Sequence, residues 1–507
     1  MSKTRLPMQA GGEPPVRGEE RILEPLLSEL SVPGHRGVRL PLLDVPATPP
    51  EDAIPDWARR AVPPRFPEVS EPEVVRHFTR LSVLNHHIDK GFYPLGSCTM
   101  KHNPRINDEL AFLPGFAEQH PLAPAALSQG ILELMHRLAS LLCEATGFDA
   151  ATLQPAAGAQ GELVGMLMVR GYHAKRGEAA QRREVIVPAS AHGTNPASVA
   201  LVGWSVREIP ALANGMVDRA ALGAALSGRT AAVMLTLPNT LGLFEPEIRD
   251  IADQVHASGA QLYLDGANFN ALAGLVQPGS IGFDLGHLNL HKTFSTPHGG
   301  GGPGAGPVLV KRHLEPFLPT PVVVEHNGEY AFDESRADSV GRVHGFYGNA
   351  GVLVRAYAYL LGLGSDGLAE VSREAILNAN YLMSRLRDAY DLPYDRTCMH
   401  EFVLSGRNLK RYGVRTLDVA KRLLDFGVHA PTVYFPLIVE EALMIEPTET
   451  ETLRGLDHFA GSMLRIAREA RESPELLKGA PHTTPVGRLD EARAAKELKL
   501  TWSPPES

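Results

Sequence analysis

Cysteine is scarce in this chain of 507 residues. The three cysteines, Cys98, Cys143 and Cys398, are far apart, odd in number and form no CxxC pair. This pattern argues against a disulfide framework and against a zinc knuckle. It favours a reducing compartment in which the three residues are small buried side chains.

The chain also lacks an excess of positive charge and lacks long apolar runs. It has 49 basic and 58 acidic residues, so its net charge is −9, and neither nucleic acid nor an anionic membrane is an expected partner. No apolar run is long enough to span a bilayer, and residues 1–17 contain no signal-like segment. We therefore expect a cytoplasmic protein. Because HExxH, GxSxG and paired Cys/His motifs are missing, we expect no metal site and no serine chemistry, and residues 158–162 do not fit the dinucleotide GxGxxG pattern.

The length of the chain predicts more than one domain, and its hydrophobic content of 44% is ample for large cores. Nine prolines between positions 41 and 72 disfavour helix and central strand, so residues 1–75 are predicted to form an extended arm. Ser70 and Glu73 form a capping-box pattern, which predicts a helix that continues to Leu84.

Short β-rich runs alternate with helical stretches between residues 152 and 310. The predicted strands are 185–187, 232–235, 262–264 and 308–310, and the helices between them include 248–255; a long amphipathic helix at 134–142 precedes this region. This alternation predicts a mostly parallel sheet with covering helices in a large domain, residues 76–344, whose ligand lies beyond the carboxyl ends of the strands. Residues 345–507 are predicted to form a smaller C-terminal α+β domain, with strands at 402–404 and 442–445.

Lys292 lies in the segment NLHKTFSTPH, and six of the next eight residues, 299–306, are glycine. A lysine beside a loop with few side chains is suited to hold an aldehyde cofactor as a Schiff base, because the backbone can approach the cofactor closely. A solvated lysine next to a flexible connection is the alternative interpretation of this segment alone.

Asp265 directly follows the predicted strand 262–264. A carboxylate at this strand end can keep the pyridine nitrogen of pyridoxal phosphate protonated. The alternative is an aspartate that only begins a turn. The interval to Lys292 leaves room for one more strand and a turn, which would bring the lysine back to the same edge of the sheet.

Three other predicted strand ends carry suitable groups. Residues 158–162 begin a predicted helix with small side chains, so free N–H groups there would bind a phosphate. His192 would stack on the cofactor ring, Thr194 would bind a ring oxygen, and Asn239 would bind the phenolic oxygen. Taken singly, each has an ordinary alternative interpretation. Residues 158–162 would be a common glycine turn, the segment with His192 a helix cap, and the segment with Asn239 an asparagine turn.

Long passages resemble pyridoxal-phosphate enzymes of the aspartate-aminotransferase fold (fold type I), and more narrowly the glycine-decarboxylating P-proteins of the glycine cleavage system. The passages are QPAAGAQGE (154–162), SAHGTNPASV (190–199), LDGAN (264–268), NLHKTFSTPHGGGGPGAG (289–306), MIEPTET (444–450) and YPLGSCTMK (93–101). The similarity extends from about residue 75 to residue 460. Ala156 departs from the family motif, which has asparagine there.

This resemblance implies glycine decarboxylation through an aldimine of pyridoxal phosphate, with release of CO₂ and transfer of the aminomethyl group to the lipoyl arm of H-protein. Lys292, Asp265 and His192 are the implied catalytic residues. The implied cofactor contacts are Lys292, Asp265, His192, Thr194, Ala159, Gln160, Gly161, Asn239, Ala267 and His291. Candidates for the substrate channel or the glycine carboxylate are Ser97, Thr99, Lys101, Asn103 and His298.

The resemblance also implies partners, since this chain is similar to the lysine-bearing second subunit of a split enzyme. A separate subunit 1, with two copies of each subunit, and lipoylated H-protein are expected, with a functional link to aminomethyltransferase and dihydrolipoyl dehydrogenase. The proline-rich arm either binds subunit 1 or packs against its own chain. Another pyridoxal-phosphate enzyme, such as an aldolase, a decarboxylase or a transaminase, is the rival prediction. A non-catalytic assembly subunit is disfavoured because such a subunit needs neither Lys292 nor Asp265.

Overall fold

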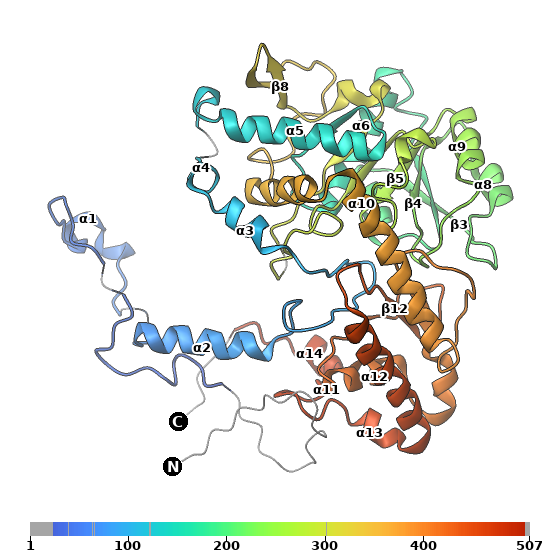
Figure 1. Ribbon diagram of the computed structural model, residues 1–507. Helices are drawn as coiled ribbons and strands as arrows, with labels where there is room; N and C mark the ends of the chain where they lie inside the picture. Colours follow the sequence, from blue (N-terminus) through green and yellow to red (C-terminus); the bar gives the residue numbers. More distant parts are fainter. Residues whose placement is uncertain are drawn as a thin grey trace. The chain divides into compact units, whose positions relative to one another are not determined.

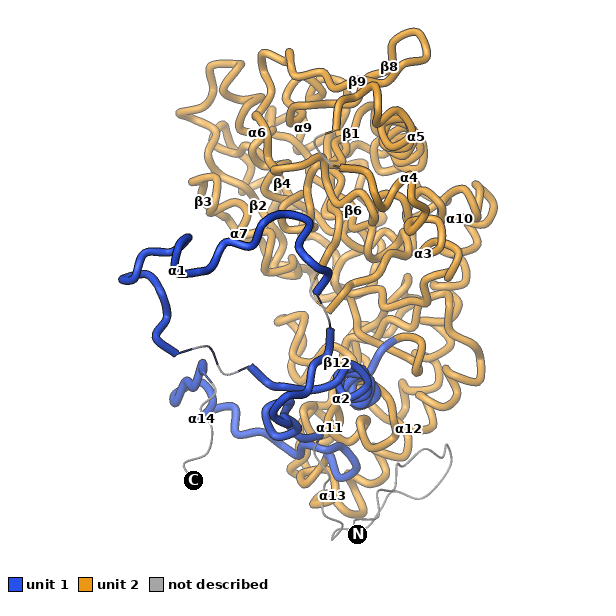
Figure 2. The backbone as a smooth tube through the Cα atoms, turned by 90° about the vertical axis from the view of Figure 1, so that its left-hand side faces the viewer, with its two compact units in different colours: residues 1–87, 481–507 blue, residues 88–480 orange. Residues whose placement is uncertain are grey.

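The computed structural model describes residues 24–38, 40–62, 64, 66–120, 123–300 and 302–501. The chain forms two compact units, one from Met1–His87 with Pro481–Ser507 and one from Ile88–Ala480 (Figure 2). The expectations for residues 1–23, including the first part of the arm, lie outside the described residues. The predicted domain limits at residues 75 and 344 stay predictions.

The smaller unit contains α1 (Pro50–Ala53), α2 (Glu71–Leu84) and α14 (Glu491–Lys496). Helix α2 begins at the predicted capping box, where the backbone N–H of Ser70 donates to Glu73 Oε2 at 2.8 Å, and it ends at Leu84. The predicted helix is therefore confirmed. The described part of the arm between residues 38 and 62 contains only α1 and a short 3-10 turn, and its side chains are exposed.

A seven-stranded sheet forms the centre of the larger unit. Its order is β1 (Ala150–Thr152), β7 (Val308–Val310), β6 (Leu285–Leu288), β5 (Gln261–Gly266), β4 (Thr230–Thr236), β2 (Glu184–Pro188) and β3 (Ser205–Ile209). Strand β7 runs antiparallel to both of its neighbours, and the other strand pairs are parallel. The four predicted strands are present, and β6 is the further strand expected between Asp265 and Lys292.

Helices cover both faces of this sheet (Figure 1). They are α5 (Gln129–Thr146), α6 (Gly158–Lys175), α7 (Thr194–Leu201), α8 (Arg219–Ala225), α9 (Ile248–Ala257) and the long α10 (Ala350–Leu386). Along β4, Val233 and Leu235 join the core of α5, α9 and α10, while Ala232 and Met234 join the core of α6 and α7. Because successive side chains of a strand point to opposite faces, this division confirms a parallel sheet that is buried on both sides.

The C-terminal part of the larger unit is built on a second, antiparallel sheet. Its strands are β10 (Phe402–Ser405), β12 (Ala442–Ile445) and β11 (Thr432–Val433), in that order. Helices α11 (Thr416–Asp425), α12 (Leu453–Glu472) and α13 (Pro474–Lys478) share its hydrophobic core. Both strands predicted in this region are confirmed.

A hairpin of β8 (Val322–His326) and β9 (Glu329–Asp333) was not predicted. Asn327-Gly328 at its turn, between β-branched and aromatic residues, is the signal that identifies such a hairpin from sequence. The short helices α3 (Arg105–Ala111) and α4 (Pro114–Ala117) precede α5. Among the described residues, no helix combines the length and the apolar character needed to cross a bilayer.

Candidate active site

Lys292 and Asp265 lie at the carboxyl ends of two neighbouring parallel strands. Asp265 is the second-to-last residue of β5, where it pairs in register with His287 of β6, and Lys292 is in the turn after β6. The Lys292 side chain is half-buried, and its Nζ donates a hydrogen bond to the carbonyl oxygen of Ser97 at 2.6 Å. The structure thus brings the predicted amine and the predicted carboxylate to one edge of the sheet.

Asp265 is held as a carboxylate in a buried position. Burial alone would raise its pKa, but neighbouring groups outweigh that effect and hold the pKa below its usual value. These groups are the imidazole of His287, whose Nε2 lies 3.6 Å away, the amide of Asn195 at 3.1 Å, the N–H of Ala267 at 3.1 Å, and the charge of Lys292. A buried acid that is ionised at neutral pH is suited to pair with a protonated ring nitrogen.

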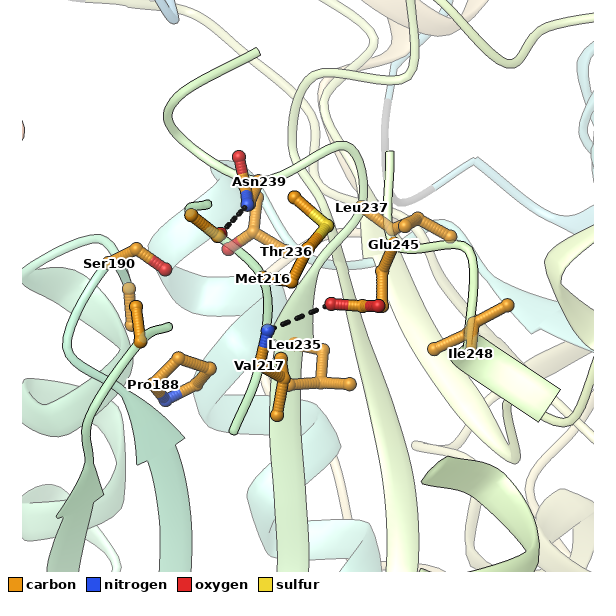
Figure 3. A pocket seen from close by; sticks show the side chains of 13 residues that line it. Pro188, Ser190, Met216, Val217, Leu235, Thr236, Leu237, Asn239, Glu245 and Ile248 are labelled. Carbon is orange, nitrogen blue, oxygen red and sulfur yellow. Dashed lines mark hydrogen bonds between the residues drawn. The ribbon is translucent and has the colours of Figure 1, made fainter. Parts of the chain in front are cut away.

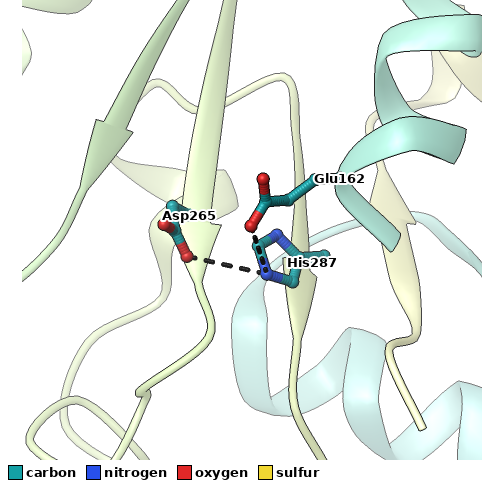
Figure 4. A group of neighbouring side chains, drawn as sticks. All are labelled: Glu162, Asp265 and His287. Carbon is teal, nitrogen blue, oxygen red and sulfur yellow. Dashed lines mark ion pairs between the residues drawn. The ribbon is translucent and has the colours of Figure 1, made fainter. Parts of the chain in front are cut away.

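Glu162 and His287 complete this cluster and were not predicted (Figure 4). Burial and the neighbouring Asp265 raise the pKa of Glu162 to about 7, while Thr194 donates to this carboxylate at 2.7 Å. Burial lowers the pKa of His287 to about 4, and its Nδ1 lies 2.9 Å from the hydroxyl of Tyr263. The two acids therefore differ in character: Asp265 stays ionised, whereas Glu162 takes up a proton near neutral pH.

The N-terminus of α6 lies against the glycine-rich loop. No side chain caps this helix, so its first N–H groups, at Gly158, Ala159 and Gln160, are available to an anion. The side chain of Gln160 turns away, accepting from the N–H of Ala156 at 2.7 Å and donating to the carbonyl of Val343 at 2.7 Å.

Close backbone contact makes glycine necessary in this cradle. A Cβ on Gly306 would lie 2.2 Å from the carbonyl oxygen of Ala157, and one on Gly161 would lie 2.6 Å from that of Gly306. A Cβ on Gly304 would lie 2.8 Å from the ring of His291, whose pKa burial lowers to about 4. The loop is therefore built so that backbone, not side chains, approaches the helix terminus.

His192 and Thr194 follow β2, as predicted, and Thr194 is the first residue of α7. The Nδ1 of His192 is 2.9 Å from the hydroxyl of Thr194, and its ring meets the edge of Phe435 at 5.5 Å. Burial lowers the pKa of His192, and the charge of Lys292 contributes. The imidazole therefore favours its neutral form, which is suited to stacking.

Asn239 lies in a cleft beyond β2 and β4, which Figure 3 shows. Its amide donates to the carbonyl of Gly215 at 2.9 Å, and its oxygen accepts from the N–H of Leu241 at 3.0 Å. These contacts bind the side chain to its own loop and to the loop between β3 and α8. In the same cleft, Glu245 accepts from the N–H of Val217 at 2.9 Å.

Among the substrate candidates, Ser97 contacts Lys292 through its carbonyl oxygen. Thr99 is buried and donates its hydroxyl to Glu446 at 2.7 Å, and Asn103 accepts from Ser295 at 2.9 Å. Lys101 is buried, and its Nζ contacts Glu449 at 2.7 Å, the carbonyl of Thr293 at 2.7 Å, Tyr359 at 3.0 Å and Asn270 at 3.2 Å. His298 lies with its ring edge-on to His291 at 5.3 Å, and burial lowers its pKa.

Several buried polar atoms around this edge have no hydrogen-bond partner among the described residues. They are Asn195 Oδ1, His287 Nε2, Asn289 Oδ1, Thr296 Oγ1 and His298 Nε2. Buried polar atoms are normally paired, so these atoms fit a site that binds a polar group. Together with an amine, a carboxylate and an uncapped helix terminus, they match the aldehyde, ring nitrogen and phosphate of pyridoxal phosphate. The fold and this set of groups define a pyridoxal-phosphate-dependent enzyme of fold type I.

Comparison with known proteins identifies the family. Residues 50–332 match the family model of the glycine cleavage system P-protein, and residues 371–482 match that of the glycine dehydrogenase C-terminal domain. The chain is 55% identical over 478 residues to a protein of Listeria innocua named probable glycine dehydrogenase (decarboxylating) subunit 2, covering 94% of this chain and 98% of that one. A protein of Chlorobium chlorochromatii with the same name is also 55% identical, with coverage of 94% and 99%. The chain belongs to the glycine cleavage system P-protein family.

Solved structures agree on the fold. The crystal structure of an inhibitor-bound glycine decarboxylase (P-protein) superposes with a TM-score of 0.67 at 21% identity, covering 82% of this chain and 93% of that chain. Glutamate decarboxylase of Lactobacillus brevis gives a TM-score of 0.63 at 13% identity, with coverage of 84% and 98%. The predicted family and fold class are confirmed, and pyridoxal phosphate is the cofactor.

Proposed function

We propose that this chain is the lysine-bearing subunit of a glycine dehydrogenase (decarboxylating), which releases CO₂ from glycine and transfers the aminomethyl group to the lipoyl arm of H-protein. One observation carries the proposal: the Lys292 amine and the buried Asp265 carboxylate share one sheet edge with an uncapped helix terminus. The names of the relatives add the substrate class.

Each residue of this edge has a defined task. Lys292 is the amine that binds the cofactor aldehyde, and the N–H groups at the start of α6 hold the phosphate. Asp265 stays ionised and keeps the ring nitrogen protonated, a charge-assisted hydrogen bond worth about 1.5–3 kcal/mol. His192 covers one face of the ring. When bound, pyridoxal phosphate supplies the electron sink for the bond that breaks at the glycine α-carbon.

The overall reaction breaks the carbon–carbon bond of glycine and the sulfur–sulfur bond of the lipoyl group. A carbon–sulfur bond and an S–H bond form, with the S–H proton taken from solvent, so the two glycine carbons together lose two electrons and the disulfide gains them. Ser97, Thr99, Asn103 and His298 remain the candidates for the lining of the lipoyl channel or for the glycine carboxylate. Lys101 is already surrounded by partners, and we assign it to the support of Thr293, next to the catalytic lysine.

The proposed partner is subunit 1, with two copies of each subunit in the assembly. The exposed arm supports this, since Leu40, Leu42 and Trp57 have 86%, 97% and 89% of their surfaces accessible. Such apolar surface is typical of an interaction site. The links to aminomethyltransferase and dihydrolipoyl dehydrogenase, and the cytoplasmic location, stay predictions.

Glycine-dependent exchange of CO₂ tests the proposal. The full chain, co-purified with subunit 1 and supplied with lipoylated H-protein, should exchange labelled bicarbonate into the glycine carboxyl group. The Lys292→Ala variant should show no exchange. Full exchange by that variant, or exchange in the wild-type assembly that does not depend on lipoylated H-protein, would reject the proposed reaction.

A further inference from the structure

The turn formed by residues 97–99 is strained and lies directly against the catalytic lysine. Ser97 and Thr99 have φ values of 65° and 49°, in the left-handed region that such residues rarely adopt. The carbonyl of Ser97, the first of this turn, accepts the hydrogen bond from Lys292 Nζ at 2.6 Å. Strain of this kind persists only where the surroundings enforce it.

Two buried glutamates hold this turn. Glu401 Oε2 accepts from the N–H of Ser97 at 2.7 Å. Glu446 accepts from both the N–H and the hydroxyl of Thr99, at 3.0 and 2.7 Å. The turn is therefore fixed at both of its ends by side chains that are more than 300 residues away in sequence.

The fold brings the two acids together from separate strands. Phe402 of β10 pairs with Ile445 of β12, so the next position along this antiparallel register sets Glu401 opposite Glu446. Both are almost fully buried, with 2% and 0% of their surfaces accessible. Two acids side by side in a buried position destabilise the fold. Their presence therefore favours a functional role over a structural one.

We propose that Glu401 and Glu446 act as positioning residues for the 97–99 turn. They hold the carbonyl of Ser97 where it accepts a hydrogen bond from Lys292 Nζ whenever that amine is not bonded to the cofactor. The amine is thereby kept beside the cofactor site and not released into solvent, which speeds its attack on the aldehyde. This inference rests on the proposed function of Lys292.

A metal site is the competing interpretation, because His400, Glu401 and Glu446 bring one ligand atom each to within 4.8 Å of one another. The hydrogen bonds favour positioning. Both oxygens of Glu446 accept from the amide of Asn268 at 2.9 Å in addition to their bonds from Thr99. Glu401 accepts from the backbone of the turn, so both acids already have donors.

The experiment separates the covalent step from binding. Pyridoxal phosphate is added to the cofactor-free full chain, and the rate at which the visible absorbance of the lysine-bound cofactor appears is followed. Affinity for pyridoxine phosphate, which has no aldehyde, is measured in parallel. For Glu401→Ala we expect the attachment rate to fall roughly 10- to 100-fold, as misplacement of a reacting group does. Pyridoxine phosphate affinity should stay within about twofold of wild type, because the groups that bind the phosphate are unchanged.

Two variants serve as controls, and a third, Thr99→Val, tests the inference if Glu401→Ala does not fold. Glu401→Gln keeps an acceptor oxygen for the N–H of Ser97 and should restore most of the rate. Asp418→Ala removes a matched buried acid that accepts a backbone N–H at the start of α11, and should leave the rate unchanged. Thr99→Val removes the hydroxyl contact to Glu446 and should slow attachment in the same direction, by a smaller factor.

The outcomes are distinct. A wild-type attachment rate in Glu401→Ala overturns the inference, and so does a parallel loss of pyridoxine phosphate binding, which would indicate general damage. If added Zn²⁺ speeds attachment in the wild type and has no effect in Glu401→Ala or Glu401→Gln, the inference is overturned in favour of the metal site. If the wild-type chain forms no lysine adduct, the proposed function itself fails.

Discussion

Replacement of Lys101 by methionine tests whether this buried lysine supports the site or binds the substrate. Only 4% of the surface of Lys101 is accessible, and its Nζ has four polar partners, of which Glu449 is the charged one. Burial alone would lower its pKa, but Glu449 and Tyr359 hold the pKa above its usual value. The ammonium is therefore charged, and its removal leaves the partner carboxylate without compensation. Breaking such a buried pair costs about 3–5 kcal/mol.

We expect urea unfolding, followed by circular dichroism, to show this loss for Lys101→Met in the cofactor-free chain. Glu449→Gln should be destabilising as well. The double variant Lys101→Met/Glu449→Gln should recover part of the loss, with a coupling of about 0.5–3 kcal/mol. An unchanged urea midpoint together with a large increase in KM for glycine would refute this reasoning, since it would show that Lys101 binds the substrate carboxylate.

Three further changes have defined outcomes. Glu162→Gln should stabilise the cofactor-free chain more as pH rises. Below pH 4.5 the acid is protonated in both the folded and the unfolded chain, and above pH 7 its buried charge destabilises the folded chain by up to about 3 kcal/mol. Melting curves of variant and wild type from pH 4.5 to 8 that differ by a constant amount would contradict the raised pKa. Gly306→Ala places a Cβ 2.2 Å from the carbonyl of Ala157 and should weaken cofactor binding by roughly 5- to 100-fold in titrations, whereas Gly223→Ala, which meets open space, should not. Deletion of residues 38–62 should weaken association with subunit 1 in sedimentation experiments and leave cofactor attachment intact; unaltered association would remove the arm from the interface.

The sheet and its ligand edge could be predicted because they follow from local pattern. Continuous apolar runs predict strands buried on both faces, and β2, β4, β5 and β7 all contain such runs. The interval between Asp265 and Lys292 indicated one more strand, and β6 occupies it. The capping box at Ser70 marked the start of α2 in the same way.

The groups that tune the site could not be predicted, because they depend on three-dimensional register. His287 reaches Asp265 only because β5 and β6 pair in parallel at that step. Glu401 and Glu446 meet through the register of β10 and β12, and neither carries a local signal of its environment. Their burial decides their charge, and burial is a property of the assembled fold.

Reductive trapping tests the central claim most directly, because it locates the covalent bond between the cofactor and the chain. The chain, loaded with pyridoxal phosphate, is treated with borohydride, digested and analysed by mass spectrometry. We expect the phosphopyridoxyl group on the peptide that contains Lys292, and no label on that peptide's counterpart from Lys292→Ala. Quantitative labelling of Lys101, Lys311 or another lysine, with Lys292 unmodified, would contradict the assignment of the site.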